Sequence, residues 1–238
     1  MLSKNIVVHI KNINVSYGDK KVLDDFSVNF FEGKRIGVIG ANGSGKSTLL
    51  KAMIGFLKLE NGEILFWGNS LKKERNKIAY LPQRESVDWD FPASVLDVVV
   101  MGLYKDLGFW KMIGKKHKEK AMMYLEKVQM ADFAQKHISE LSGGQQQRVF
   151  LARAFAQEAD LYLLDEPFAG IDVSSEEIIA DLLIELQRKN KTIIMVHHQI
   201  DTLSKYFDEV LMVKNGKNML YGNVKEVITT ENLQLLYN

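Results

Sequence analysis

The sequence of 238 residues contains no cysteine, only 3 prolines and no excess of either charge. The absence of cysteine excludes disulfide bonds and thiolate metal sites, and it is typical of a reducing compartment. The 31 basic residues nearly match the 30 acidic ones, and the net charge of +1 gives no sign of a protein that binds nucleic acid or a membrane surface. We therefore expect no nucleic acid among its partners.

Long apolar runs are also missing. Val98 to Met101 is typical of the apolar runs in this sequence, whereas a membrane-spanning helix needs about 20 apolar residues. Residues 1–5 lack the apolar core of a secretory signal peptide. We therefore expect any membrane role to come through a separate protein.

The composition is that of an ordinary globular protein, with 46% apolar and 26% charged residues, which suffices for a sizeable core. Apolar residues two apart over 6–10 and 26–30 predict strands of a small antiparallel sheet. Residues 35–39 predict a strand that runs into a glycine-rich loop, and apolar residues over 49–54 then follow at helical spacing. This order of strand, loop and helix is the one that a phosphate-binding loop requires.

Residues 85–158 lose the alternation and show helical patterns instead, which predicts a helical insertion. Apolar runs after the insertion predict strands at 161–165, 192–196 and 210–213. Because strands alternate with helices here, the sequence predicts an α/β fold with a parallel sheet.

One of the predicted helices covers residues 174–189, whose apolar side chains lie on one helix face. Ser174 followed by Glu177 fits a capping box, in which each side chain accepts the other residue's backbone N–H. We therefore expect this helix to begin at Ser174.

The glycine-rich loop from Gly40 to Ser47 matches the Walker A pattern at every fixed position. Its glycines let backbone N–H groups turn toward phosphates, and the following helix N-terminus attracts negative charge. Lys46 is expected to reach the β- and γ-phosphates, and the Ser47 hydroxyl to bind Mg²⁺. The alternative, a glycine turn of structural use only, is disfavoured by the strand and helix around it. The residues of this segment expected to contact the nucleotide are Gly40, Asn42, Gly43, Ser44, Gly45, Lys46, Ser47 and Thr48.

Two acids, Asp165 and Glu166, end the apolar run at 161–165. A carboxylate at Asp165 would hold Mg²⁺ through its water shell, and Glu166 would orient and polarise the attacking water in phosphoryl transfer. The alternative is that Glu166 merely caps a loop before Pro167. The phosphate loop upstream favours the catalytic interpretation.

Between these two elements, residues 141–145 read LSGGQ. The order of phosphate loop, glutamine, LSGGQ, acid pair and late histidine resembles the ATP-binding cassette family over essentially the whole chain. The resemblance implies a P-loop NTPase (RecA-like) core with an N-terminal antiparallel β subdomain and a helical insertion subdomain. It implies one domain over 1–238, in which 1–84 and 159–238 form the nucleotide-binding core and 85–158 form the helical subdomain with the signature motif.

The resemblance also assigns roles to two residues outside the Walker segments. Tyr17 matches the aromatic residue that stacks on adenine, and a tyrosine ring stacks on any base. The alternative is a hairpin ring packed on the sheet. Gln83 matches the glutamine that reaches Mg²⁺ and the attacking water, and its alternative is a solvated loop residue.

By the same resemblance, the signature motif and a later loop lie at a dimer interface. The motif residues, which would contact the γ-phosphate of ATP held by the other subunit, are Ser142, Gly143, Gly144 and Gln145. A simple helix cap from Ser142 to Gln145 is the alternative, and the two are compatible because a capped helix N-terminus binds anions. Gly170 and Asp172 correspond to the loop that crosses the dimer, where Gly170 is a variation on the family pattern.

Two adjacent histidines, His197 and His198, end the strand at 192–196. A metal site is disfavoured because neighbouring strand residues point to opposite faces and no third ligand cluster is evident. The resemblance assigns His198 to the γ-phosphate and places His197 where the family usually has threonine. Gln199 replaces the usual acid.

The resemblance implies an ATPase that uses ATP and Mg²⁺ at the cytoplasmic face of the cell membrane. The implied partners are a second copy of the chain, an integral membrane permease and, indirectly, an extracytoplasmic solute-binding protein. Residues 84–103 are either core of the helical subdomain or a docking groove for the permease.

The segment from Val87 to Pro92, with residues 168–172 and 196–198, resembles the ATPase subunits of bacterial manganese, zinc and iron importers. Among these we expect a manganese importer, with zinc, iron, siderophore or haem as alternatives. An alternative of another class is a soluble cassette ATPase that acts on ribosomes or DNA. Such proteins usually carry two cassettes, long coiled coils or basic extensions. A third alternative is a nucleoside kinase or another transferase with a phosphate loop. The LSGGQ motif disfavours it, because such an enzyme would have no use for the motif.

Overall fold

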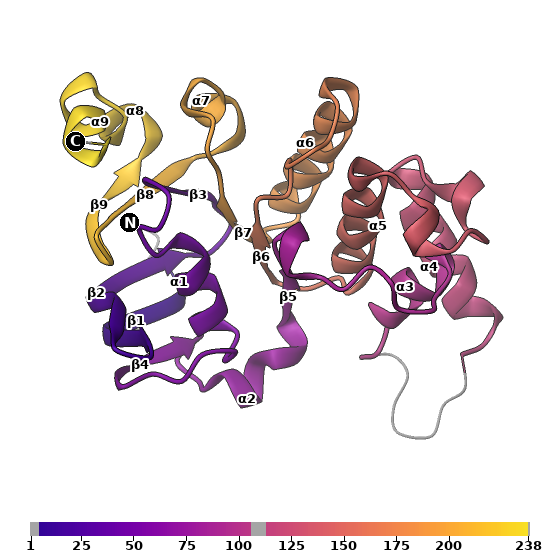
Figure 1. The fold of residues 1–238 in the computed structure, drawn as a ribbon, viewed down its shortest axis with the longest axis horizontal. Coiled ribbons are helices and arrows are strands. Elements are labelled where there is room, and N and C mark those ends of the chain that lie inside the picture. The colour runs from indigo at the N-terminus through magenta and orange to yellow at the C-terminus, as the bar shows by residue number, and fades with distance from the viewer. Residues whose placement is uncertain (1–4, 106–112, 238) are drawn as a thin grey trace.

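The structure of the chain is a computed structural model that describes residues 5–105 and 113–237 (Figure 1). Residues 1–4, on which the expectation about a signal peptide largely rests, lie outside the described part. The central sheet is six-stranded, with its first five strands parallel and the last antiparallel. In spatial order its strands are β5 (Ile78–Leu81), β6 (Leu161–Asp165), β7 (Thr192–Val196), β3 (Arg35–Ile39), β8 (Glu209–Lys214) and β9 (Lys217–Asn223). The predicted α/β fold with a parallel sheet is confirmed.

Strand β6 shows why these sequences form a buried parallel sheet. Leu161 and Leu163 pack into a core shared with helix α1 (Lys46–Met53), whereas Tyr162 and Leu164 pack into a second core on the opposite face. A run that is apolar on both faces is typical of parallel strands with helices on both sides.

The carboxyl ends of three adjacent strands meet at one edge of this sheet. Strands β6, β7 and β3 are neighbours, and they are followed by the acid pair, the histidine pair and the phosphate loop. In open α/β sheets, ligands bind outside the carboxyl ends of the strands. The fold therefore brings together residues that lie more than a hundred positions apart in the sequence.

A second, three-stranded antiparallel sheet lies beside helix α1 and shares its apolar core. In spatial order its strands are β2 (Lys20–Phe31), β1 (Ile6–Tyr17) and β4 (Asn61–Phe66). Val8, Ile10, Phe26 and Phe30 are buried in the core, which confirms the antiparallel sheet predicted for the N-terminal part.

Three helices of the predicted insertion pack on one another at the end of the molecule far from the antiparallel sheet (Figure 1). They are α3 (Val95–Met101), α4 (Lys115–Lys127) and α5 (Gly143–Ala156). Trp89 and Phe91 are partly buried against this core, and the Trp89 ring centroid lies 4.6 Å from that of Phe150. These contacts favour the interpretation of residues 84–103 as core.

Helix α6 (Val173–Arg188) begins one residue before the predicted start, and the predicted capping box of Ser174 and Glu177 is wrong. Asp172 is the cap, because its carboxylate accepts the backbone N–H of Ser175 at 2.9 Å. Its bonds to the Ser174 hydroxyl and to the N–H and hydroxyl of Ser175 hold the pKa of Asp172 well below its usual range.

The remaining helices are short: α2 (Leu71–Glu74), α7 (Leu203–Tyr206), α8 (Val224–Val227) and α9 (Thr230–Tyr237). Over the described residues, none of the helices has both the length and the apolar character needed to cross a membrane.

Candidate nucleotide-binding site

The loop between β3 and α1 is shaped by its first glycine. Gly40 has a φ of +154°, and a Cβ built on it would lie 2.2 Å from the carbonyl oxygen of Val213. Only a glycine lets the loop pass this close to strand β8. The loop therefore turns sharply into helix α1, whose N-cap is Gly45.

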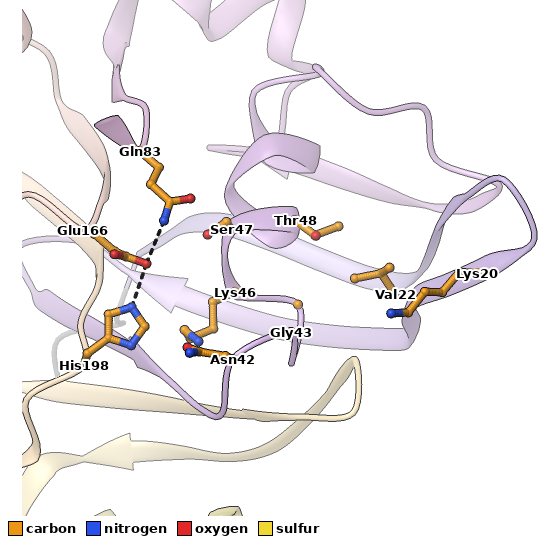
Figure 2. Close-up of a pocket in the computed structure, with 11 residues that line it drawn as sticks. Lys20, Val22, Asn42, Gly43, Lys46, Ser47, Thr48, Gln83, Glu166 and His198 are labelled. Atoms are coloured by element: carbon orange, nitrogen blue, oxygen red, sulfur yellow. Dashed lines mark hydrogen bonds and ion pairs between the residues drawn. The ribbon is translucent and has the colours of Figure 1, made fainter. Parts of the chain in front are cut away.

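A cavity of about 780 Å³ opens over this loop, within the usual range for ligand sites (Figure 2). Its lining comprises Lys20, Val22, Asn42, Gly43, Gly45, Lys46, Ser47, Thr48, Gln83, Glu166 and His198. The structure thus gathers most of the residues expected to contact the nucleotide or to act on it. Lys20 and Val22, at the start of β2, were not predicted from the sequence. No local pattern marks them, because they reach the cavity only through the packing of β2 against Gly45.

Three residues expected to contact the nucleotide are not in this lining. Gly40 turns its carbonyl oxygen to the Lys46 ammonium, and the Ser44 hydroxyl is buried without a hydrogen-bond partner. Tyr17 ends strand β1 with 48% of its surface exposed. A ring packed on the sheet would be buried, and the exposure of Tyr17 therefore disfavours that alternative.

Lys46 is the cation at the centre of the loop. Its side chain is buried, and Nζ donates to the carbonyl oxygens of Gly40 at 2.9 Å and Ala41 at 3.0 Å. Burial lowers the pKa of the Lys46 amine, while the carboxylates of Glu166 and Asp165 oppose this effect. A buried ammonium held by two neutral carbonyls gains a stronger acceptor when a phosphate enters.

Asp165 and Ser47 form a pair that fits a divalent cation. The Ser47 hydroxyl donates to Asp165 Oδ1 at 2.9 Å, and Asp165 is fully buried. Its Oδ2 has no hydrogen-bond partner, and burial raises the pKa of Asp165 to about 6. A buried carboxylate oxygen without a partner is costly, and oxygen ligands of this kind are those that Mg²⁺ prefers. The residues present therefore fit Mg²⁺.

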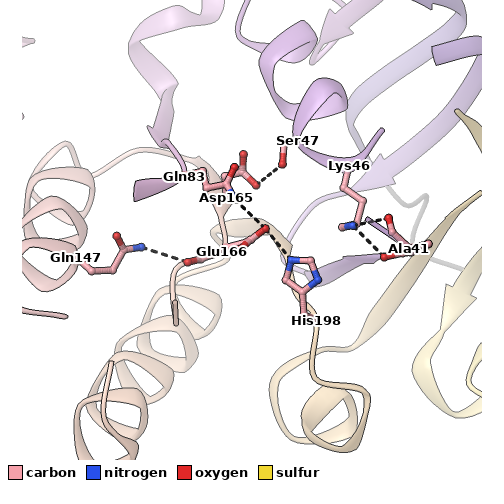
Figure 3. Close-up of polar contacts among 9 residues, drawn as sticks. Ala41, Lys46, Ser47, Gln83, Gln147, Asp165, Glu166 and His198 are labelled. Carbon is pink, nitrogen blue, oxygen red and sulfur yellow. Dashed lines mark hydrogen bonds and ion pairs between the residues drawn. The ribbon is translucent and has the colours of Figure 1, made fainter. Parts of the chain in front are cut away.

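Glu166 is held at three points, as Figure 3 shows. Its Oε1 accepts the amide of Gln83 at 3.3 Å and lies 2.7 Å from His198 Nε2. Its backbone carbonyl accepts the Gln147 amide of helix α5 at 3.3 Å. Glu166 also has a φ of +52°, a left-handed conformation that is uncommon outside glycine. The carboxylate is thereby fixed in the lining of the cavity that also contains Lys46 (Figure 2).

The two adjacent histidines point to different places. His198 reaches Glu166, whereas His197 is buried and its Nε2 lies 2.7 Å from Thr202 Oγ1. Within residues 5–105 and 113–237, no group of three or more His, Cys, Asp or Glu side chains is placed to hold a metal ion. A metal site built on the histidine pair is therefore not supported.

The signature residues form a capped helix N-terminus. Ser142 Oγ accepts the backbone N–H of Gln145 at 3.4 Å, and Gln145 Oε1 accepts that of Ser142 at 2.9 Å, which confirms the predicted capping box. A Cβ on Gly144 would lie 2.6 Å from the carbonyl oxygen of Gly170, and this close approach brings the signature against the loop that leads to Asp172. None of the four signature residues lines the described cavity of the same chain.

Stability will depend on pH through His197. Burial lowers the pKa of His197 from 6.5 to about 4, an effect that His198 reinforces and Glu176 opposes. The unfolded chain therefore takes up this proton first as the pH falls. The contribution of His197 to the free energy of unfolding is complete above about pH 6.5, and about 2 kcal/mol of it is lost by pH 4.5.

Urea unfolding of the wild type and of His197→Gln at pH 7.5 and pH 4.5 measures this loss. The variant is expected to lose about 2 kcal/mol less than the wild type between the two pH values. Burial raises the pKa of Asp165 and so contributes with the opposite sign, but it does so in both proteins and cancels. Equal losses in the two proteins would contradict the prediction.

Known proteins share both the sequence and the fold. The model of the ABC transporter family matches residues 23–169. A manganese transport system ATP-binding protein of Bacillus subtilis is 50% identical over 97% of this chain and 92% of its own length. A zinc transport system ATP-binding protein of Treponema pallidum is 47% identical over 97% of this chain and 86% of its own length.

Solved structures of ABC transporter subunits have the same fold as this chain. The subunit CbiO1 of an ABC transporter complex from Clostridium perfringens is 30% identical with a TM-score of 0.78, covering 97% of this chain and 93% of that one. An ATP-binding cassette of an ABC transporter in its ADP conformation is 26% identical with a TM-score of 0.77, covering 97% of this chain and 98% of that one. The family model covers well over half of the chain, and the two relatives agree with it. The chain therefore belongs to the ABC transporter family, as an ATP-binding and ATP-hydrolysing subunit.

Proposed function

We propose that two copies of the chain bind ATP between them, each site combining the phosphate loop of one copy with the signature motif of the other. The placement of the signature supports this, because Ser142 to Gln145 form an anion-binding helix end outside the cavity of their own chain. ATP then joins the two copies, since its γ-phosphate satisfies donors on both. Gly170 and Asp172 lie between the two sites in this arrangement.

In each site, Lys46 holds the β- and γ-phosphates and Tyr17 stacks on the adenine. Ser47, Asp165 and Gln83 hold Mg²⁺, which when bound neutralises charge on the phosphates. Gln83 donates to Glu166 and lines the same cavity as Ser47, which supports its place in this set.

The Glu166 carboxylate accepts a hydrogen bond from the water that attacks the γ-phosphorus, and takes its proton as the P–O bond forms. His198 Nε2, which is 2.7 Å from Glu166 Oε1, orients the carboxylate and contacts the γ-phosphate. Cleavage to ADP and phosphate removes the ligand shared by the two copies, and the pair opens.

We further propose that residues 85–158 act as one helical subdomain, and that residues 1–84 and 159–238 form the nucleotide-binding core. The helical part carries the signature on α5, and Gln147 of this helix bonds the backbone of Glu166. The subunit docks on an integral membrane permease at the cytoplasmic face, and an extracytoplasmic solute-binding protein delivers the cargo. Sedimentation with membranes only when the permease is coexpressed separates this role from a soluble ATPase acting on ribosomes or DNA.

The cargo that we propose is manganese. The observation that carries this choice is the 50% identity with a manganese transport system ATP-binding protein over 97% of the chain. Zinc is the second candidate, because a zinc transport system ATP-binding protein is 47% identical over the same share.

Deletion of the gene, followed by measurement of cellular manganese, zinc and iron in one sample, tests the cargo. We expect manganese to fall several-fold while zinc and iron stay level. The wild-type gene should restore the manganese level, and a Lys46→Ala gene should not. A fall in zinc alone would establish the second candidate, and unchanged levels of all three metals would contradict metal import.

A further inference from the structure

His197 is a buried, titratable side chain beside the catalytic residues, and neither the nucleotide nor the water contacts it in the proposed mechanism. It is 5% exposed, directly follows strand β7 and directly precedes His198. Its backbone N–H donates to the carbonyl oxygen of Val38 in strand β3 at 3.1 Å. The residue is thus anchored to the central sheet one position before the histidine that reaches Glu166.

The His197 ring takes part in a short chain of hydrogen bonds. The Thr202 hydroxyl donates to the carbonyl oxygen of Gln199 at 3.0 Å, and His197 Nε2 lies 2.7 Å from the same hydroxyl oxygen. Because a hydroxyl has one hydrogen to donate, this oxygen accepts from Nε2–H, which assigns the tautomer of the neutral ring. These hydrogen bonds close the turn from residue 197 to residue 202, which contains His198.

The same ring packs against the loop that carries Glu166 and against the end of helix α7. Its centroid lies 5.9 Å from that of Phe168, two residues after Glu166, and 6.0 Å and 5.4 Å from those of Tyr206 and Phe207. The Tyr206 hydroxyl in turn donates to Glu176 of helix α6 at 2.6 Å. His197 therefore links the turn of His198, of which it is the first residue, to the loop of Glu166.

We propose that His197 is a positioning residue, which through Thr202 and Phe168 holds His198 Nε2 and Glu166 Oε1 at hydrogen-bonding distance. The proposal rests on the function proposed above, because it assumes that Glu166 and His198 act in hydrolysis. A shift of about 1 Å in a catalytic group can cost roughly 100-fold in rate. The ring contributes two separable contacts, a hydrogen bond to Thr202 and an apolar face to Phe168.

A double-mutant cycle between His197 and Thr202 tests the hydrogen bond. His197→Phe keeps an aromatic ring and removes the bond. Thr202→Val removes the same bond from the other side without a large change in volume, together with the bond from Thr202 to the Gln199 carbonyl. Each is expected to lower kcat roughly 10-fold, with the KM for ATP changed less than about 2-fold, because the contacts that the phosphate loop and Tyr17 make with ATP are untouched. The double variant should be no slower than Thr202→Val alone, because Thr202→Val already removes the bond that His197→Phe removes.

His197→Gln is the rescue variant, because its amide can donate to Thr202, and it should recover most of kcat. His137→Phe is the matched control: His137 also bonds a nearby hydroxyl, with Nδ1 2.7 Å from Ser139 Oγ, but lies away from the cavity. It should leave kcat unchanged.

Three results would overturn the proposal: unchanged kcat in both single variants, losses that multiply in the double variant, or a loss that follows the unfolding midpoint without rescue by Gln. Failure of the proposed function is distinguishable, because the wild type itself would then lack ATP hydrolysis or Glu166→Gln would keep it.

Discussion

Replacement of Glu166 by Gln will lower the rate of ATP hydrolysis by roughly 10² to 10⁴-fold, the range expected for the loss of a general base. The amide keeps the shape of the side chain and an oxygen that can still bond His198, but it cannot take a proton from water. Binding of ATP depends on the phosphate loop, and it should therefore be retained.

Phosphate release measures turnover, and gel filtration with ATP and Mg²⁺ measures the dimer. We expect the variant to elute as an ATP-bound dimer that persists for longer than that of the wild type. Glu63→Gln, which changes an exposed carboxylate on β4, is the matched control and should hydrolyse ATP at the wild-type rate. Rapid multiple turnover by Glu166→Gln would remove Glu166 from the proposed role.

The second large effect is expected at Ser142. A carboxylate introduced by Ser142→Glu would face the γ-phosphate of the other copy, and two like charges about 4 Å apart repel by about 4 kcal/mol near a protein surface. Hydrolysis should fall at least 100-fold, even though the variant keeps every residue of its own cavity. Lys46→Ala should be equally inactive for a different reason, because it loses the phosphate-binding cation.

Mixing the two inactive variants separates sites built within one chain from sites shared between two. In a mixed dimer, the phosphate loop of Ser142→Glu meets the intact signature of Lys46→Ala, and one site of two is complete. Equal mixing should restore about a quarter of the wild-type activity, because half of the dimers are mixed. No recovery on mixing, or full turnover by a strictly monomeric wild type, would contradict the shared site.

Much of the site was predictable because it is built from short segments at strand ends. Strands β3 and β7 have the predicted bounds, and β6 ends at Asp165 as expected. A parallel sheet places the carboxyl ends of neighbouring strands side by side, so that residues after these ends meet whatever their distance in the sequence. His197 and His198 point to different places as expected, although both follow strand β7 and do not belong to it.

The start of helix α6 was not predictable from the same kind of pattern. Ser174 and Asp172 are both good caps, two residues apart, and the sequence does not show which one the preceding loop will place at the helix end. That choice depends on the turn after Glu166, where Ala169 N–H bonds the Glu166 carbonyl and Ile171 N–H bonds that of Phe168.

Contacts between segments far apart in the sequence could not be predicted either. Lys20 and Val22 line the cavity because β2 packs against the phosphate loop, and Gln147 reaches the backbone of Glu166 from another helix. Each contact joins segments whose spacing in the sequence carries no periodic signal. Such residues become visible only when the sheets and helices are assembled.

The left-handed backbone conformation of Glu166 sets the stability of the fold against the rate of hydrolysis. A φ of +52° costs an ordinary side chain on the order of 1 kcal/mol, and glycine or asparagine adopts it more readily. Selection of this protein for heat tolerance alone would therefore favour those residues at position 166, and each would discard the carboxylate. The strained conformation persists because the residues that adopt this φ angle most readily, glycine and asparagine, lack the carboxylate that activates water.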